Sequence, residues 1–328
     1  MKSLLFITFL SLTFASLSYA NDNLPGVSKF IDEMHDEHGF DKVELRTIFE
    51  QVIIKQSILK AIARPAEKSK PWYDYRKIFI TQKRINNGRA FWQANKKALV
   101  KAEKQFGVPA EIIIAILGVE TSYGSNVGSY RVVDALSTLA FRYPPRSKFF
   151  RSELGHFLFL TREEKMSVLS PMGSYAGAMG LGQFMPSSFR AYAVDFDGDG
   201  KRDIWTNPTD AIGSIANYLN RHGWVAGESI AHKTTVAGSP PVALLEKGTK
   251  PDIERGELVS AGVSIISLPS GANQLAIISL TQLEGEEYWL TRQNFYSITR
   301  YNHSRMYAMA VTQLAALISQ EYNVTNQP

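Results

Sequence analysis

The sequence predicts an α+β protein that is mostly helical, with a small β subdomain inserted late in the chain. Apolar residues three and four positions apart, the spacing of an amphipathic helix, recur along most of the sequence. Over about residues 227–290 the pattern changes. Segments such as Val263–Leu268 and Leu275–Leu280 are short, rich in β-branched residues and bounded by Pro, Gly and Ser, which is typical of strands. Helical spacing then returns over Ser304–Tyr322.

Helix start and stop signals set the bounds of the predicted helices. Gly107 is expected to close one helix, and Pro109 suits the first turn of the next. Asn207–Asp210 supplies a cap, a proline and a first-turn acid, and Asp134 is expected to cap another helix. The predicted helices, in order, are Val27–His38, Val43–Ile62, Gly88–Phe106, Pro109–Glu120, a helix from Asp134, Ser147–Glu164, a helix from Pro186, and Asn207–His222.

The composition indicates a globular protein and excludes several classes. The chain has 328 residues, of which 45% are hydrophobic and 20% charged, so it can bury a core. The formal net charge of +5 permits attraction to an acidic polymer, but the basic residues are scattered, which argues against nucleic acid as a partner. The sequence contains no cysteine, so neither a disulfide nor a lipid-modified N-terminal cysteine can form.

The N-terminus has the pattern of a secretory signal. Lys2 is followed by an apolar run, Leu4–Leu17, and then by Ser18–Ala20, whose small residues suit signal peptidase. The alternative, a membrane anchor, is disfavoured because the run is too short to span a bilayer comfortably. We therefore expect cleavage after Ala20 and an exported mature protein with no transmembrane segment.

One carboxylate lies at the end of an apolar helix face. Ile112, Ile116 and Glu120 are four positions apart, so they share one face of the predicted helix. Glu120 also lies at the helix C-terminus, where the macrodipole disfavours negative charge; desolvation and the dipole are both expected to raise its pKa. A carboxyl group that keeps its proton near neutrality can protonate the leaving oxygen of a glycosidic bond. The alternative is a glutamate that simply ends a helix at the surface.

Several segments together resemble one enzyme family. They are Gly118–Gly124 (GVETSYG), Gly173–Ser188 (GSYAGAMGLGQFMPSS), Asp210–Tyr218, and Arg300–Asn302 with Tyr307–Val311. In these segments the chain is similar to the lytic murein transglycosylase B family, which are lysozyme-like enzymes that act on peptidoglycan. The likeness covers about residues 75–311. Each glycine-rich piece alone is a weak signal, whereas the combination is specific.

The resemblance implies a reaction and its catalytic residue. Glu120 falls on the single acid/base glutamate of the family, which cleaves the β-1,4 bond between N-acetylmuramic acid and N-acetylglucosamine without adding water. Two-carboxylate glycosidases need a second acid. In this family the C6 hydroxyl of muramic acid attacks instead, leaving a 1,6-anhydro end. The alternatives are a muramidase that hydrolyses the same bond, and a non-catalytic peptidoglycan-binding protein.

The resemblance also implies substrate-binding residues. Ser174 and Gln183 match positions that hydrogen-bond the reacting sugar, and the alternative for both is turn chemistry. Tyrosine suits sugar binding because it offers a flat apolar face and a hydroxyl. The alternative, above all for Tyr218 and Tyr307, is core packing. The residues that match family cleft positions are Tyr75, Tyr218, Tyr301, Asn302 and Tyr307.

An aspartate-rich loop predicts a calcium site. From residue 195, acids occupy positions 1, 3, 5 and 9 and glycine occupies position 6, as in an EF-hand. Position 12 is Thr206 rather than a bidentate glutamate; the family has a longer loop, which Asp210 would close. The predicted ligands are Asp195, Asp197, Asp199, the backbone carbonyl of Lys201, and Asp210. Calcium is expected to be structural, sodium is an alternative, and the chemistry is expected to need no cofactor.

The expected organisation joins these elements into a lysozyme-like fold. The parts, in order, are a signal peptide (1–20), an N-terminal helical domain (21–75) expected to pack with the C-terminal helix, a lysozyme-like helical core (76–226) containing the loop 195–210, a small β subdomain (227–286), a return to the core cleft (287–303), and the C-terminal helix (304–328). We expect a periplasmic monomer, not lipidated, that binds peptidoglycan glycan strands; other cell-wall enzymes are open as partners. The sequence leaves open whether cleavage starts at strand ends or within strands, and any preference for peptide stems.

Overall fold

The computed structural model describes residues 24–63 and 70–325. Contacts divide the chain into two units, residues 1–52 and 53–328. The predicted signal peptide lies outside the described residues. The other domain boundaries expected from the sequence stay predictions, and the two units are described separately below.

The first unit contains two helices, α1 (Val27–His38) and α2 (Lys42–Glu50). Gly39 ends α1 in a left-handed conformation, with φ 66°. Asp41 then caps α2, because its side chain accepts a hydrogen bond from the Glu44 amide at 2.7 Å. The helix predicted for Val27–His38 is therefore confirmed at both ends.

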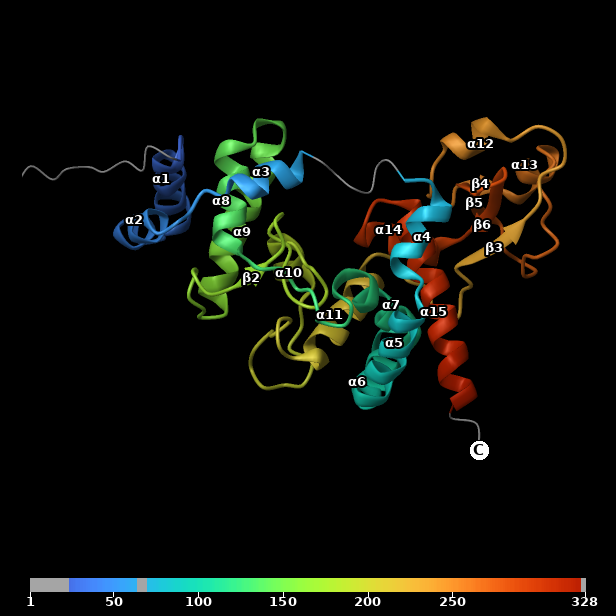
Figure 1. The fold of residues 1–328 in the computed structure, drawn as a ribbon, viewed down its shortest axis with the longest axis horizontal. Coiled ribbons are helices and arrows are strands. Elements are labelled where there is room, and N and C mark those ends of the chain that lie inside the picture. The colour runs from blue at the N-terminus through green and yellow to red at the C-terminus, as the bar shows by residue number, and fades with distance from the viewer. Residues whose placement is uncertain (1–23, 64–69, 326–328) are drawn as a thin grey trace, which may run out of the picture. The chain divides into compact units, whose positions relative to one another are not determined.

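The second unit is mostly helical and is built around one buried helix. Its helices are α3 (Gln56–Ile62), α4 (Trp72–Phe79), α5 (Gln82–Ala94), α6 (Lys96–Phe106), α7 (Ala110–Thr121), α8 (Val132–Arg142), α9 (Ser147–Glu163), α10 (Pro186–Tyr192), α11 (Pro208–Arg221), α12 (Val242–Glu246), α13 (Arg255–Ser260), α14 (Gln293–Tyr301) and α15 (Arg305–Thr325), with a 3₁₀ turn at Pro144–Arg146. Helix α7 is apolar on all sides and is buried along nearly its whole length. It packs against α5, α6, α11 and α15, and Figure 1 shows α15 running beside α5 and α7. The core of this unit therefore surrounds α7, the helix that carries Glu120.

A four-stranded antiparallel sheet is inserted between α11 and α14. Its strands are β3 (Ala231–Thr234), β4 (Ile253–Glu254), β5 (Gln274–Thr281) and β6 (Glu286–Thr291), in the order β3–β6–β5–β4. β5 and β6 pair from Ala276 opposite Thr291 to Thr281 opposite Glu286, and Figure 1 shows α12 and α13 beside the strands. An apolar cluster fills this subdomain: Leu244, Ile253, Leu258, Val263, Leu268, Ala272, Leu275, Ile277 and Leu290. The predicted class, mostly helical with a small antiparallel sheet, is confirmed.

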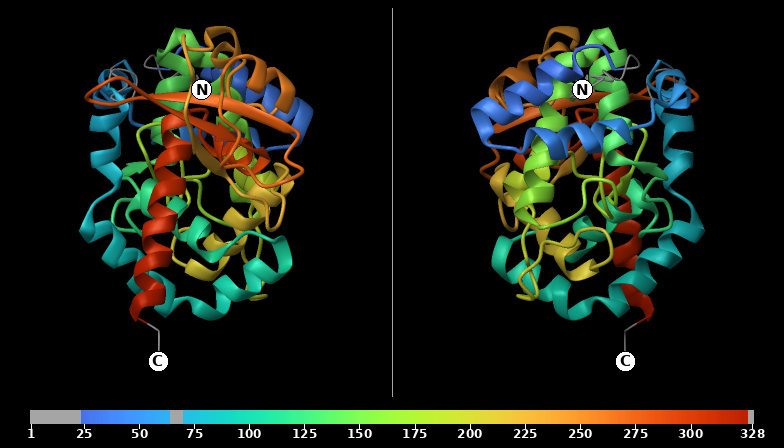
Figure 2. Two further views of the ribbon diagram at one scale, coloured as in Figure 1. Left: turned by 90° about the vertical axis from the view of Figure 1, so that its right-hand side faces the viewer. Right: turned by 90° about the vertical axis from the view of Figure 1, so that its left-hand side faces the viewer.

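Two short strands lie at the start of the glycine-rich segment. β1 (Tyr130–Arg131) pairs antiparallel with β2 (Met172–Gly173), with Tyr130 opposite Gly173. β1 leads directly into α8, and β2 leads into the segment from Gly173 to Pro186. The views in Figure 2 show that the helices of this unit enclose these loops.

Three predicted elements are wrong in detail, each for a local reason. Val263–Leu268 is not a strand: it forms turns with a single bridge from Val263 to Val236, and Val263 and Leu268 pack in the core from a loop instead. Gly88–Phe106 is two helices, because Asn95 leaves helical geometry and its side-chain amide bonds the Phe91 carbonyl at 2.9 Å. Val43–Ile62 is also two helices, with residues 51–55 between them.

Asp134 is not the cap of its helix, which is a fourth correction. Helix α8 starts two residues earlier, at Val132, so Asp134 lies in the first turn, where an acid stabilises the helix dipole. Its carboxylate is buried and accepts from Arg131 at 2.9 Å and from the Ile53 amide at 3.0 Å. It therefore ties the start of the second unit's chain to α8.

Candidate active site

Glu120 lies in the last turn of α7, next to a strained stretch of backbone. The residues before it in the helix are buried, and Glu120 itself is half-buried. The helix ends in a Schellman pattern, with the Tyr123 amide bonding the Leu117 carbonyl at 3.1 Å. Ser122 and Tyr123 both adopt positive φ, 51° and 61°, where glycine is usual. Such residues cluster at functional sites, where the surrounding structure holds the strained backbone in place.

A tyrosine from the C-terminal helix holds the Glu120 carboxylate. The Tyr307 hydroxyl donates to Glu120 Oε1 at 2.6 Å. Tyr307 is only 2% exposed, and burial together with the Glu120 charge raises the pKa of its phenol well above its ordinary value. Burial and Glu120 likewise raise the pKa of Tyr301. Both phenols therefore stay protonated and can act as hydrogen-bond donors next to the carboxylate.

Behind this pair lies a layer of packed aromatic rings. Tyr301 donates to the Gly182 carbonyl at 2.5 Å, and its ring lies 4.8 Å from that of Tyr218. Tyr218 donates to the Arg300 carbonyl at 2.6 Å, and burial raises the pKa of its phenol. Tyr218 is 8% exposed and Tyr75 is 0% exposed. In this structure Tyr75 therefore has no open face for a sugar, and Tyr75, Tyr218 and Tyr307 all contribute to core packing.

Ser174 and Gln183 lie in the glycine-rich segment, whose turns are joined by bridges from Met179 to Gly173 and Phe184. The Ser174 hydroxyl accepts from the Ala178 amide at 3.1 Å. Both residues are half-buried. Both take part in the turn chemistry that the sequence offered as the alternative, and this does not conflict with sugar binding, since a hydroxyl has further hydrogen-bonding capacity.

Gln183 connects the glycine-rich segment to a loop that the sequence pattern did not identify. Its side-chain amide donates to the Gly180 carbonyl at 2.9 Å and to the Val127 carbonyl at 3.2 Å, and its φ is +53°. Thr121, buried and next to Glu120, donates to the Leu181 carbonyl at 2.9 Å and accepts from the Gly124 amide at 3.0 Å. Neither Thr121 nor Val127 was predicted, although the family-like GVETSYG segment contains Thr121.

Replacing Gly128 by alanine is expected to lower the free energy of unfolding of the protein by about 3 kcal/mol. Gly128 has φ +94°, and a Cβ there would lie 2.1 Å from the backbone carbonyl of Gly173, next to Ser174. Urea unfolding measures the loss. Gly271→Ala is the matched control, because Gly271 has a similar φ of +89° but no atom within 4 Å of the added Cβ. Equal losses in the two variants would contradict the close approach of the two loops.

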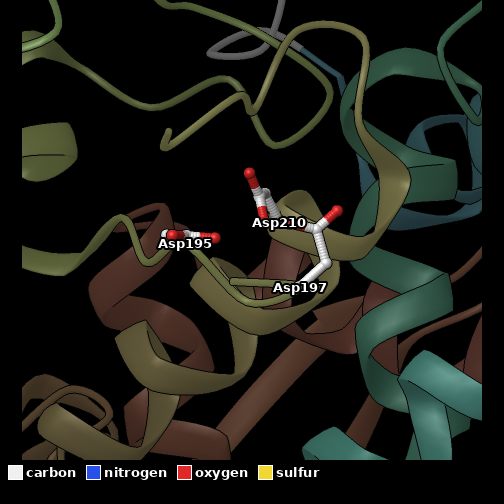
Figure 3. A group of neighbouring side chains, drawn as sticks. All are labelled: Asp195, Asp197 and Asp210. Carbon is white, nitrogen blue, oxygen red and sulfur yellow. The ribbon is translucent and has the colours of Figure 1, made fainter. Parts of the chain in front are cut away.

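The aspartate-rich loop brings three carboxylates together. Asp195, Asp197 and Asp210 each offer an oxygen, and these oxygens lie within 4.8 Å of one another. Figure 3 shows Asp195 and Asp197 on the loop and Asp210 on helix α11. Asp210 is fully buried, and burial, with a contribution from the Asp197 charge, raises the pKa of its carboxyl. Three oxygen donors of like charge at this spacing fit a hard cation such as calcium.

Other predicted members of the loop lie outside this group of three. Asp199 accepts from the Lys201 amide at 2.9 Å, which belongs to the turn. Asp203 bonds the Thr206 amide and hydroxyl, so Thr206 is held at the position where an EF-hand has its glutamate. The Asp203 amide donates to Asp210 at 2.8 Å. The longer loop therefore brings Asp210 to the place that Thr206 leaves without a carboxylate.

No helix in the described part of the chain is both long enough and apolar enough to cross a bilayer.

Comparisons with known proteins place the chain among transglycosylases. The family model described as the transglycosylase SLT domain matches residues 23–316 of this chain. The soluble lytic transglycosylase SltB1 from Pseudomonas aeruginosa is 51% identical; its structure gives a TM-score of 0.86, over 90% of this chain and 99% of that chain. The Escherichia coli lytic transglycosylase Slt35, solved in complex with calcium, is 42% identical, with a TM-score of 0.84 over 92% and 94% of the two chains. SltB3 from Pseudomonas aeruginosa, solved in complex with NAG-anhNAM-pentapeptide, is 30% identical, with a TM-score of 0.78 over 89% and 78%.

The fold and the family match define the chain as an enzyme, a lytic transglycosylase that acts on peptidoglycan. More narrowly, the chain belongs to the family of the membrane-bound lytic murein transglycosylase B of Escherichia coli (strain K12). It is 42% identical to that protein over 306 residues, which are 90% of this chain and 83% of that protein. The resemblance noted in the four sequence segments is therefore confirmed.

Proposed function

We propose that the enzyme cleaves the β-1,4 bond between N-acetylmuramic acid and N-acetylglucosamine, with Glu120 as its only acid/base. The hydrogen bond from Tyr307 to Glu120 carries this proposal, because it fixes the carboxyl at the end of an apolar helix beside buried phenols. A general acid needs this fixed orientation toward the leaving oxygen. The charge of Glu120 acts on both Tyr301 and Tyr307.

One carboxyl is sufficient if the substrate supplies the nucleophile. Glu120 protonates the glycosidic oxygen as the bond to the anomeric carbon breaks. The muramic C6 hydroxyl then attacks that carbon, and Glu120 takes the hydroxyl proton, which restores the acid. No water is consumed, and the product ends in a 1,6-anhydro ring. A hydrolytic enzyme with two carboxylates would instead use the second acid as a nucleophile or as a base for water.

The remaining predicted residues are proposed to act around Glu120. We propose that Ser174 and Gln183, half-buried in the glycine-rich segment, hydrogen-bond the reacting sugar. Tyr301 and Asn302 follow each other at the end of α14, both half-buried, and we propose that they also bind the sugar. Tyr75 and Tyr218 are buried, so we propose that they support the cleft by positioning Tyr307 and Tyr301.

Changing Tyr307 to phenylalanine is expected to lower kcat by about ten- to a hundredfold while KM changes little. Phenylalanine keeps the buried ring but removes the donor to Glu120, and a hydrogen bond to a charged group contributes about 1.5–3 kcal/mol. Steady-state cleavage of peptidoglycan measures the effect. Tyr322→Phe on the same helix is the control, since its hydroxyl bonds Gln93 at 3.0 Å. A Tyr307→Phe enzyme with wild-type kcat would remove Tyr307 from the mechanism.

We also propose that the loop binds calcium as a structural ion, with sodium as an alternative. The three carboxylates of Asp195, Asp197 and Asp210 would supply the charge. Asp199 and the Lys201 carbonyl would complete the oxygen ligands. The calcium complex of the Slt35 structure supports this proposal by family likeness. In this proposal calcium would hold the loop and take no part in the proton transfers.

The place of action follows from the substrate. We propose that the protein is exported to the periplasm by its N-terminal signal and works there as a monomer without a lipid anchor. The absence of cysteine excludes lipidation at cysteine. Export would bring the enzyme to peptidoglycan, which lies outside the cytoplasmic membrane.

Product analysis tests the proposed reaction. Purified peptidoglycan is digested with the enzyme, and the muropeptides are weighed by mass spectrometry. We expect ends that are lighter by one water than hydrolytic ends. Products with ordinary reducing ends would support a muramidase instead. Strand binding without any release, in both the wild type and Glu120→Gln, would support a non-catalytic binding protein.

A further inference from the structure

A cavity lies where the sheet meets the starts of two helices. It has a volume of about 480 Å³ and is lined by Lys70–Trp72, by β5 residues Ile278–Thr281 and by His303–Met306, among others. Helix α4 begins there at Trp72 and α15 begins there at Arg305. Figure 1 shows α4 and α15 side by side next to the sheet. Since the positive ends of both helix dipoles meet here, the cavity favours an anion.

The wall of this cavity is cationic. The cations Lys70 and Arg305 line it and are exposed, and none of the described lining residues is acidic. Within residues 24–63 and 70–325, neither Lys70 nor Arg305 forms an ion pair. Arg305 occupies the first turn of α15, which contains no acid, and a cation is unfavourable there unless an anion lies near. These charges need a partner that the described chain does not supply.

Hydrogen-bond donors accompany the charges. Trp72 lines the cavity and is 1% exposed, yet its indole N–H has no acceptor among the described residues. Pro71, the residue before α4, gives that helix no side-chain cap. A buried donor without an acceptor is costly, so the wall is suited to a ligand that brings oxygen acceptors.

The cavity adjoins the catalytic cluster through both helices. Arg305 lies two residues, or about 3 Å of helix rise, before Tyr307, which bonds Glu120. The Trp72 ring packs 6.2 Å from that of Tyr75, which acts electrostatically on Tyr307. Both helices therefore link the cavity to residues that pack around Glu120, which favours a ligand carried on the same substrate.

We propose that this cavity binds a free carboxylate of the peptide stem on N-acetylmuramic acid. This inference rests on the proposed function, because it takes peptidoglycan as the substrate. The sugar rings are uncharged, whereas the stem carries carboxylates and hangs from the muramic acid next to the cut bond. Lys70 and Arg305 attract the carboxylate, and the helix starts and the indole offer donors. The enzyme would thus prefer strands whose stems keep their negative charge.

The test compares two soluble probes on the full-length protein. One is NAG-NAM-pentapeptide, and the other is the same compound with its free carboxylates converted into amides. Isothermal titration calorimetry gives both affinities for the wild type, for the Lys70→Gln/Arg305→Gln double variant and for a Lys104→Gln control. Lys104 is exposed on α6, which does not line the cavity. Steady-state cleavage of glycan strands whose stems carry either free carboxylates or amides gives KM and kcat for each form.

We expect the amidated probe to bind the wild type and Lys104→Gln about tenfold more weakly than the charged probe. The double variant should bind both probes alike, and on strands the change should appear in KM rather than kcat. Equal binding of the two probes by the wild type would overturn the proposal, as would a double variant that keeps the preference. An enzyme that cleaves nothing would refute the proposed function but not this inference, because the calorimetric comparison still decides it.

Discussion

Changing Glu120 to glutamine is expected to lower the release of glycan fragments from peptidoglycan by about a thousandfold or more. Glutamine has nearly the same shape and can still accept the Tyr307 hydrogen bond, so the fold should be kept. It cannot give up or take a proton, and both halves of the proposed reaction need that transfer. Mass analysis of released muropeptides measures the loss, and circular dichroism with a melting curve checks the fold.

Glu111→Gln is a suitable control for this experiment. Glu111 lies in the first turn of the same helix, is half-buried, and burial raises the pKa of its carboxyl as well. The two substitutions remove the same charge from opposite ends of α7, but only Glu120 touches Tyr307. Turnover near the wild-type rate in Glu120→Gln would refute Glu120 as the acid/base.

Saturating calcium is expected to raise the melting temperature of the wild type by about 5 °C. The carboxylates of Asp195, Asp197 and Asp210 repel one another at their spacing of less than 5 Å, and a divalent ion would replace this repulsion by attraction. In Asp197→Ala the gain should disappear. Without calcium this variant should be about as stable as the wild type, because it loses one of three like charges.

Differential scanning calorimetry with and without calcium measures these shifts. Asp252→Ala is the control, since Asp252 is an exposed aspartate in the β subdomain. It should show the full calcium gain. A wild type that does not respond to calcium, or an Asp197→Ala protein that responds fully, would contradict the metal site.

Local patterns were enough to predict the helices that carry the site. The spacing of Ile112, Ile116 and Glu120 predicted α7 within one residue at each end, and the cap, proline and acid of Asn207–Asp210 predicted the start of α11. These features depend only on neighbours along the chain. The glycine-rich segment was also identified from sequence, because its close approaches to other backbone require glycine.

Long-range contacts could not be predicted in the same way. The bond between Glu120 and Tyr307 joins residues 187 positions apart, and no local pattern encodes it. The complete burial of Tyr75 depends on α4 packing against α15. The strand prediction for Val263–Leu268 was wrong for a similar reason: Val263 packs in the subdomain core from a turn, and β propensity does not distinguish this from a strand.

The distance in sequence between Glu120 and Tyr307 has a consequence for the order in which the chain is synthesised and folds. Helix α15 follows all other described elements in the chain, so Glu120 has no phenolic partner until Tyr307 has been synthesised and has folded back onto α7. Until then the growing chain contains Glu120 but lacks the hydrogen bond that holds its carboxylate. Under the proposed mechanism, the ability to cleave peptidoglycan would therefore depend on this late folding step.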